Sequence, residues 1–250
     1  MMEKTEGTIF MLILVASAIT GKPKWPLQKC SRNDPQISEC ILRAARHAMP
    51  LLKNGIKELK VPRMDPLDAG NYSMSVHRGP VSLDLLLEKL RIHGACTMNL
   101  TALNFNKDKL RALLDGETNK VVIDANYILS GKLFRVPINS RGLITFTVGD
   151  LHIFHDITFI PRTTKKKSFI EMNINKIKFK TYEKFHMNTY NPSIAHWAND
   201  ALNKLLNDNS RLLFNSFSQI AEKMVQDVFA EALKPMLLNY SYDELLPETL

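Results

Sequence analysis

The fold is decided by residues 200–233, DALNKLLNDNSRLLFNSFSQIAEKMVQDVFAEAL. Large apolar residues recur in this stretch at steps of three and four, namely Leu202, Leu205, Leu206, Leu213, Phe217, Ile220, Met224, Val228 and Phe229. This period predicts one long helix of about nine turns with an apolar stripe along one face. At about 1.5 Å per residue the helix would span roughly 50 Å, which exceeds the width of a small domain. The stripe therefore requires an extended apolar partner surface.

The middle of the chain supplies a partner surface made of strands. Between residues 57 and 184 the apolar period changes to two, which is typical of β-strands. The predicted strands are residues 72–78, 81–93, 97–105, 121–138, 143–160 and 168–182. The segment Pro161–Ser168 separates two of these runs, and its lysines indicate a solvated hairpin tip.

Two of the predicted strands change their apolar face part of the way along. In residues 121–138 the apolar positions are Val121, Ile123, Tyr127 and Leu129, followed by Phe134, Val136 and Ile138. In residues 143–160 they are Ile144, Phe146 and Val148, followed by Leu151 and Ile153. Such a shift indicates a β-bulge or a strand that passes from one covered side to the other. Bent, overlong strands form a curled sheet that can wrap a rod, and the candidate bends are Gly131, Gly142 and Gly149.

A shorter helix is predicted near the N-terminus, over residues 35–54. Asp34 is the expected N-cap and Pro35 the first helical residue. We expect a bend or break near Pro50, where one backbone hydrogen bond is lost, and a stop at Gly55.

The first residues resemble a secretory signal peptide. An apolar run, Thr8–Ile19, follows a charged stretch and precedes small residues. A short membrane anchor or a buried strand is the alternative. We expect residues 1–21 to be removed and residues 22–250 to form a single secreted domain.

Three cysteines would then meet an oxidising compartment. The simplest arrangement is one bridge, between Cys30 and Cys40 around the start of the first helix, with Cys96 reduced. Three free buried thiols are the alternative. Asn71, Asn99 and Asn239 each begin an Asn-x-Ser/Thr triplet and are candidate glycosylation sites if the chain is secreted and these residues are exposed.

Motifs of the common enzyme and metal classes are absent from the sequence. There is no G-x-S-x-G, H-E-x-x-H, paired C-x-x-C, P-loop or G-x-G-x-x-G motif. His152 and His155 are three apart in a strand, so they should point to opposite faces and cannot chelate one metal unless a bulge intervenes. The net charge of +8 includes a lysine-rich group, namely Lys165, Lys166, Lys167, Lys176, Lys178 and Lys180. Secretion argues against nucleic acid, so we interpret this charge as solubilising, with weak attraction to anionic membranes second.

Several short motifs, taken in order, resemble the takeout and juvenile-hormone-binding family of secreted insect proteins. After the two cysteines come Val61-Pro-Arg-Met-Asp-Pro-Leu67, Gly79-Pro-Val-Ser-Leu83, His93-Gly94, Asn126-Tyr-Ile-Leu-Ser-Gly-Lys-Leu-Phe-Arg-Val-Pro-Ile138, Leu202-Asn203 and Tyr242-Asp-Glu-Leu-Leu-Pro247. The family usually has a second glycine in Asn139-Ser-Arg-Gly142 and an aromatic residue where Leu246 stands. The single cysteine pair is closer to the takeout-like branch.

The resemblance implies an α+β fold in which a highly curved antiparallel sheet wraps one long C-terminal helix, with a short N-terminal helix beside it. It also implies an apolar tunnel that carries one elongated lipid, such as a juvenile-hormone-like terpenoid or a fatty acid. The expected protein is a monomer that is not an enzyme, has no cofactor or metal, binds no nucleic acid and has no stable membrane anchor.

The expected tunnel lining consists of apolar residues on the inward faces, and for each of them plain core packing is the alternative. The residues are Phe134, Val136, Ile138, Ile144, Phe146, Val148, Ile170, Met172, Ile174, Phe217, Ile220 and Met224. No polar residue stands out as the anchor of a ligand head group. The alternative function is a protein-binding or membrane-surface module, and a hydrolase is a distant third.

Overall fold

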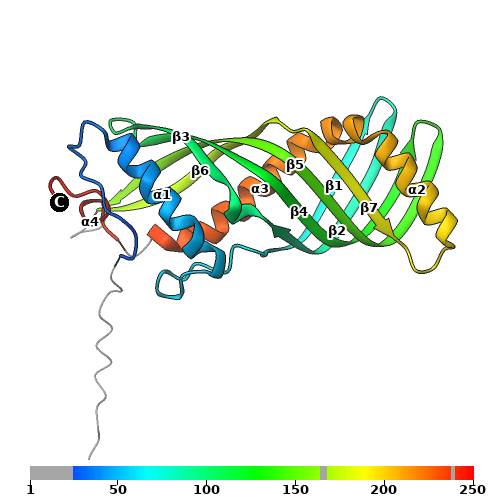
Figure 1. The fold of residues 1–250 in the computed structure, drawn as a ribbon, viewed down its shortest axis with the longest axis horizontal. Helices are drawn as coiled ribbons and strands as arrows, with labels where there is room; N and C mark the ends of the chain where they lie inside the picture. The colour runs from blue at the N-terminus through cyan, green and yellow to red at the C-terminus, as the bar shows by residue number, and fades with distance from the viewer. Residues whose placement is uncertain (1–24, 164–167, 238–239) are drawn as a thin grey trace, which may run out of the picture.

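Two very long strands run through the whole sheet. In the computed structural model, which describes residues 25–163, 168–237 and 240–250, β4 spans Arg111–Leu133 and β5 spans Val136–Thr163. They pair with each other in antiparallel register along their full common length. Together they form the central spine of the sheet (Figure 1).

The remaining strands extend the sheet from one half of this spine or the other. At one end β2 (Val81–His93) pairs with β4, β1 (Leu67–Arg78) pairs with β2, and β7 (Lys184–Tyr190) pairs with β5. At the other end β3 (Asn99–Asn106) pairs with β4 and β6 (Ser168–Thr181) pairs with β5. All pairings are antiparallel, and short 3₁₀ turns lie at Lys57–Leu59 and Ala95–Thr97.

The change of apolar face in β5 occurs at one defined place, shared with β4. Asp150 has a φ of 50°, and the paired residues on either side are Lys120 with Gly149 and Thr118 with Leu151. Ile144, Phe146 and Val148 face the interior before this point, and Leu151, Ile153 and His155 face it afterwards. A local irregularity therefore keeps both halves of β5 on the concave side, as the bulge interpretation predicts.

The second expected change of face is a turn between strands, which corrects the prediction of one strand over residues 121–138. β4 ends at Leu133, and Phe134, with a φ of 56°, begins the two-residue turn that leads into β5. Gly131 and Gly142 do mark special backbone positions, with φ values of 127° and 151°. A Cβ atom at either would come within 2.0 Å of a carbonyl oxygen on the adjacent strand. Gly149 does not have a positive φ, because the irregularity falls on Asp150.

The C-terminal helical stretch is divided, which corrects the prediction of one helix over residues 200–233. α2 spans His196–Asp208 and α3 spans Ser210–Leu237, with Asn209 between them. The Asn209 side chain donates to the carbonyl oxygen of Leu205 at 2.8 Å. Short polar side chains that bond to nearby backbone weaken helix continuity, which explains why the break falls in the Asn-Asp-Asn-Ser run. α2 lies along β7, and α3 runs obliquely through the concave side of the sheet (Figure 1).

α1 (Ile37–Asn54) and α4 (Tyr242–Leu245) lie together at the end of the molecule opposite α2 (Figure 1). The N-cap of α1 is Gln36, not Asp34; the Asp34 side chain accepts the backbone N–H of Gln36 at 2.8 Å. α1 continues past Pro50, so the helix is not broken there, and its last turn ends before Gly55 as expected. The expected architecture, a highly curved antiparallel sheet around a long C-terminal helix, is confirmed.

Polar side chains of α3 attach this helix to both sides of the curled sheet. On β6, Glu222 accepts the backbone N–H of Phe179 at 2.9 Å, and Gln226 donates to the carbonyl oxygen of Ile174 at 2.6 Å. On β1, the Tyr72 hydroxyl lies 3.5 Å from Asp227. Glu222 is buried and also lies 3.3 Å from Lys178 Nζ, so its charge is compensated.

Candidate functional site

Two adjoining cavities lie between the concave face of the sheet and α3. The α2-side cavity has a volume of about 140 Å³ and includes Leu206 of α2 in its wall. The α1-side cavity has a volume of about 330 Å³ and includes Ala44 and Ala48 of α1. The residues common to both walls are Ala95, Met98, His155 and Phe229.

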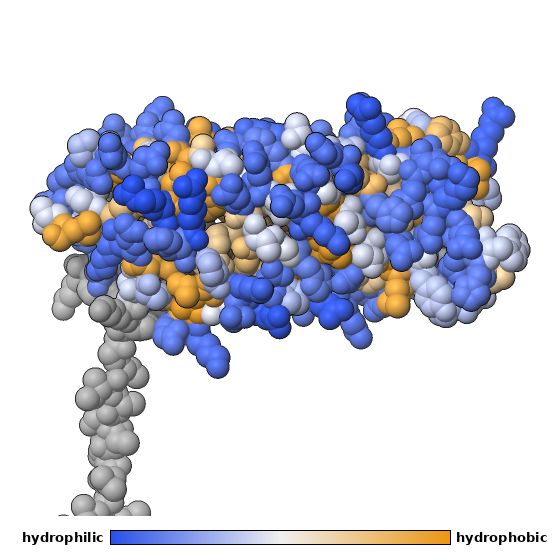
Figure 2. All heavy atoms as spheres, viewed as in Figure 1, coloured by the Kyte–Doolittle hydropathy of each residue, from blue (hydrophilic) through white to orange (hydrophobic). Residues whose placement is uncertain are grey.

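The walls of both cavities are almost entirely apolar. In the α2-side cavity only His155 and Ser218 carry a side-chain nitrogen or oxygen atom. In the α1-side cavity Trp25, Gln28, His155 and Tyr242 do so, and Cys96 contributes a thiol. By contrast, the outer face shown in Figure 2 is predominantly hydrophilic, with apolar residues scattered over it. The lining thus offers a hydrophobic environment with few hydrogen-bonding groups.

Most of the predicted lining residues do border a cavity. Those in the α2-side wall are Ile144, Phe146, Val148, Phe217 and Met224, and those in the α1-side wall are Ile170, Met172 and Ile174. Ile138 is buried in the hydrophobic core, and Ile220 is partly buried and packs against that core. Neither residue borders a cavity. Their placement fits the alternative of plain core packing.

Phe134 and Val136 are corrections to the predicted lining. Both lie at the turn between β4 and β5, with 52% and 46% of their surface exposed. They belong to the exterior because the change of face assigned to them is a turn, and the strand does not continue through it.

Several lining residues were not predicted, although the sequence carries a signal for some of them. Alternation in β2 places Leu83, Leu85 and Leu87 in the α2-side wall. His155 occupies an inward position within the alternating series Leu151, Ile153, His155, Ile157 and Phe159. A single histidine within an apolar alternation is a signal that sequence reasoning could have used.

His155 and His152 point to opposite sides of β5, as expected. His152 Nε2 lies 3.4 Å from Asp115 Oδ1, outside the cavities, whereas His155 borders both cavities. Burial lowers the pKa of His155 to about 4, although a backbone hydrogen bond with Leu114 and the charge of Asp115 act in the opposite direction. The imidazole is therefore neutral at ordinary pH, and its Nδ1 is buried without a hydrogen-bond partner within the described structure.

Cys96 is a half-buried free thiol in the α1-side wall. Burial raises its pKa to about 11; the charge of Asp65 adds to this rise and Lys53 opposes it. The thiol is consequently protonated and a weak nucleophile at neutral pH.

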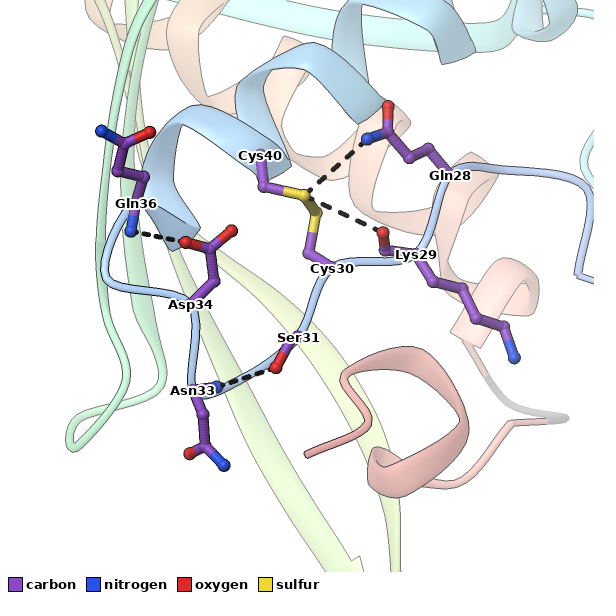
Figure 3. The surroundings of a disulfide bond; sticks show 8 residues. All are labelled: Gln28, Lys29, Cys30, Ser31, Asn33, Asp34, Gln36 and Cys40. Carbon is purple, nitrogen blue, oxygen red and sulfur yellow. Dashed lines mark hydrogen bonds between the residues drawn. A yellow bond between two sulfur atoms is a disulfide. The ribbon is translucent and has the colours of Figure 1, made fainter. Parts of the chain in front are cut away.

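A disulfide between Cys30 and Cys40 joins the N-terminal arm to the first turns of α1, with a Cα–Cα distance of 5.9 Å (Figure 3). The arm continues past Arg32, which contacts Asp243 and stacks over the Tyr242 ring at 4.8 Å. Trp25 packs edge-on against Tyr240, with ring centroids 4.8 Å apart. The disulfide thus fixes the arm to α1, and the contacts of Arg32 and Trp25 hold the arm against the C-terminal segment. Both the arm and this segment border the α1-side cavity.

Within the described part of the chain, no group of three or more His, Cys, Asp or Glu residues is arranged to hold a metal. Among the same residues, no helix combines the length and the hydropathy needed to cross a bilayer.

A curled sheet closed by a long helix around an apolar interior defines a class of tubular proteins with a hydrophobic core cavity. The chain belongs to the haemolymph juvenile hormone binding protein family, whose family model matches residues 9–247. This confirms the resemblance seen in the sequence motifs.

Individual relatives agree with this assignment. The chain is 27% identical over 236 residues to the circadian clock-controlled protein daywake of Drosophila melanogaster, covering 88% of this chain and 86% of that protein. Daywake of Drosophila yakuba is 24% identical over 232 residues, with the same coverage of 88% and 86%. The crystal structure of Epiphyas postvittana Takeout 1 superposes with a TM-score of 0.73 at 16% identity, covering 88% of this chain and 99% of that one, which shows a shared fold.

Proposed function

We propose that the protein is a secreted carrier that holds one elongated hydrophobic molecule in its two cavities. The observation that carries this proposal is the pair of adjoining, almost wholly apolar cavities between the sheet and α3. Family membership supports it, because the family is named for proteins that bind juvenile hormone, a small hydrophobic molecule. The candidate cargo is a terpenoid of that kind, a fatty acid or a related lipid.

Binding in such a site depends mainly on the length of the apolar chain. Each methylene removed from water contributes roughly 0.8 kcal/mol. Association itself costs roughly 4–15 kcal/mol, so a short chain gains too little to bind and a long one binds well. The lining residues include no lysine, arginine or acidic side chain, so a carboxylate inside the cavities would have no opposite charge beside it. Uncharged lipids are therefore the preferred cargo, ahead of fatty acids.

Residues 1–21 act as a signal peptide and residues 22–250 form one domain; the signal and Asn239 lie outside the described residues. Asn71 and Asn99 are exposed and therefore accessible to glycosylation. The carrier acts as a monomer without enzymatic activity, cofactor, nucleic-acid partner or stable membrane anchor.

The test is to express the full chain in insect cells and to recover the protein from the culture medium. Native mass spectrometry and solvent extraction should reveal a co-purified lipid, or uptake of added lipid by the delipidated protein. N-terminal sequencing should begin near residue 22. A protein that is empty and also takes up no apolar probe would overturn the carrier function.

A membrane-surface role is the second candidate, favoured by apolar residues exposed at the α2 end. Trp197 is 75% exposed, and Leu143 and Tyr190, which pair across β5 and β7, are 56% and 46% exposed. Salt-sensitive co-sedimentation with anionic vesicles, without uptake of a free lipid, would favour this function over the carrier.

A further inference from the structure

The point where the two cavities meet carries one hydrogen-bonding side chain. Of the four residues common to both walls, Ala95, Met98 and Phe229 are apolar, and only His155 bears side-chain nitrogen atoms. Its Nδ1 is buried and has no hydrogen-bond partner within the described structure. The side chain nevertheless keeps some accessible surface, because it borders the cavities.

In the described structure no side chain forms a hydrogen bond with Nδ1. Asp115 follows Leu114, the cross-strand partner of His155, but its carboxylate is engaged outside the cavities by Lys180 and by His152 at 3.4 Å. A buried polar atom without a partner is destabilising, and a ligand group that bonds to it removes that penalty. A hydrogen bond formed in apolar surroundings is also stronger than one in water.

We propose that His155 is the polar anchor of the cargo, and that the cargo is an uncharged lipid with a hydroxyl or carbonyl oxygen at an internal position of its chain. The anchor lies between the cavities, so the two arms of such a lipid extend in opposite directions from the oxygen. The α1-side cavity is the larger, so it takes the longer arm. A neutral imidazole offers one donor and one acceptor nitrogen, which suits an uncharged oxygen group and not a carboxylate.

This inference rests on the carrier function proposed above, so its test measures uptake by the cavities and anchoring by His155 separately. Uptake of diphenylhexatriene, a rod-shaped fluorescent hydrocarbon, reports on the apolar cavities alone. Displacement of this probe then compares two isomeric long-chain alcohols, one with the hydroxyl at an internal carbon and one with it at the chain end. An alcohol both donates and accepts, so it bonds to either tautomer of His155.

The variants are His155→Leu, His155→Asn and His152→Leu. Leucine removes the unpartnered nitrogen and leaves the wall apolar, so the variant should fold. Asparagine retains a polar amide near the position of Nδ1. His152→Leu is the matched control, because it changes the same residue type on the same strand but on the outer side.

We expect the preference for the internal alcohol over its isomer to fall about ten-fold in His155→Leu, and to be largely retained in His155→Asn and His152→Leu. An unchanged preference in His155→Leu with normal probe uptake would overturn the anchor and leave the carrier function intact. An equal fall in His152→Leu would also overturn it. Failure of the unmodified protein to take up the probe would overturn the carrier function and the anchor with it.

Discussion

The side-chain amide of Asn203 pairs with both backbone groups of Thr189, as a neighbouring strand would. Asn203 Oδ1 accepts the Thr189 N–H at 2.7 Å, and its Nδ2 donates to the Thr189 carbonyl oxygen at 3.0 Å. Asn207 and Asn199 make the same two bonds to Met187 and Asn191. Four residues of helix rise about 6.0 Å and two residues of strand about 6.7 Å, so α2 and β7 stay in register over these three pairs.

Substituting Asn203 should measure what this pairing contributes. Thr189 is only 1% exposed, so Asn203→Ala leaves its buried N–H and carbonyl group without partners. We expect a loss of about 2–4 kcal/mol in the free energy of unfolding, measured by urea denaturation. Lys204→Ala, next to it on the exposed face, removes only a surface pair with Asp208 and should cost about 0.5 kcal/mol or less. Similar losses in both variants would contradict the strand-like role of the amide.

Filling the α2-side cavity should impair uptake of an apolar probe. Val148 borders this cavity, so Val148→Trp places an indole ring where a ligand would lie. We expect the affinity for diphenylhexatriene to fall about ten-fold or more, measured by fluorescence titration. Val136→Trp, the same change at an exposed position of β5, should leave uptake unchanged. If the two variants bind the probe equally well, the ligand lies elsewhere.

His155 should make the fold sensitive to mild acid. Its folded-state pKa of about 4 lies below the ordinary value of 6.5, so the unfolded chain binds a proton first as the pH falls. The stability that depends on neutral His155 is present above about pH 6.5 and is lost progressively toward pH 4. Between pH 7 and pH 4.5 the free energy of unfolding should fall by about 2 kcal/mol more in the unmodified protein than in His155→Leu. Asp115, whose charge acts on the imidazole, is present in both proteins, so the difference between the two curves isolates the effect of His155. Parallel pH curves would contradict burial of a neutral imidazole.

Removing the disulfide should loosen the arm beside the α1-side cavity. Cys30 and Cys40 close a short ring, so replacing both with serine should cost about 2.5–3 kcal/mol of unfolding free energy.

Cys96 provides an internal check on the presence of the disulfide, because its buried thiol should react slowly with iodoacetamide at pH 8 and rapidly after denaturation. Mass spectrometry of the alkylated native protein should show little modification. Rapid labelling of more than one thiol in the native protein would show that the bridge is absent.

The general architecture followed from periodicity, since a long amphipathic helix and strands with shifting faces have few other ways to bury their apolar residues. The first part of β4 was missed because inward positions such as Gly116 and Thr118 carry little hydrophobic signal. β7 is short, and its two inward apolar residues, Phe185 and Met187, make only a brief alternation. The break at Asn209 depends on side-chain bonds to backbone that compete with a helix-compatible pattern.

The site was harder to predict, because an apolar residue that borders a cavity and one that packs in the core look the same in a sequence. Ile138 and Ile144 lie on the same strand with similar burial, yet only Ile144 borders a cavity. The sequence analysis did not place His155 in the lining, because its apolar neighbours on β4 and α3 are distant in the sequence.

Helix side chains occupy the outer edges of three strands. The Asn199, Asn203 and Asn207 amides of α2 bond to β7, and Glu222 and Gln226 of α3 bond to β6. On β3, Ser38 of α1 accepts the Phe105 N–H at 3.0 Å and Arg46 donates to the Leu100 carbonyl oxygen at 2.8 Å. Free strand edges are the templates on which β proteins associate into aggregates and fibrils. A second molecule cannot extend the sheet where these side chains already bond, so these three edges do not act as templates for strand-to-strand aggregation.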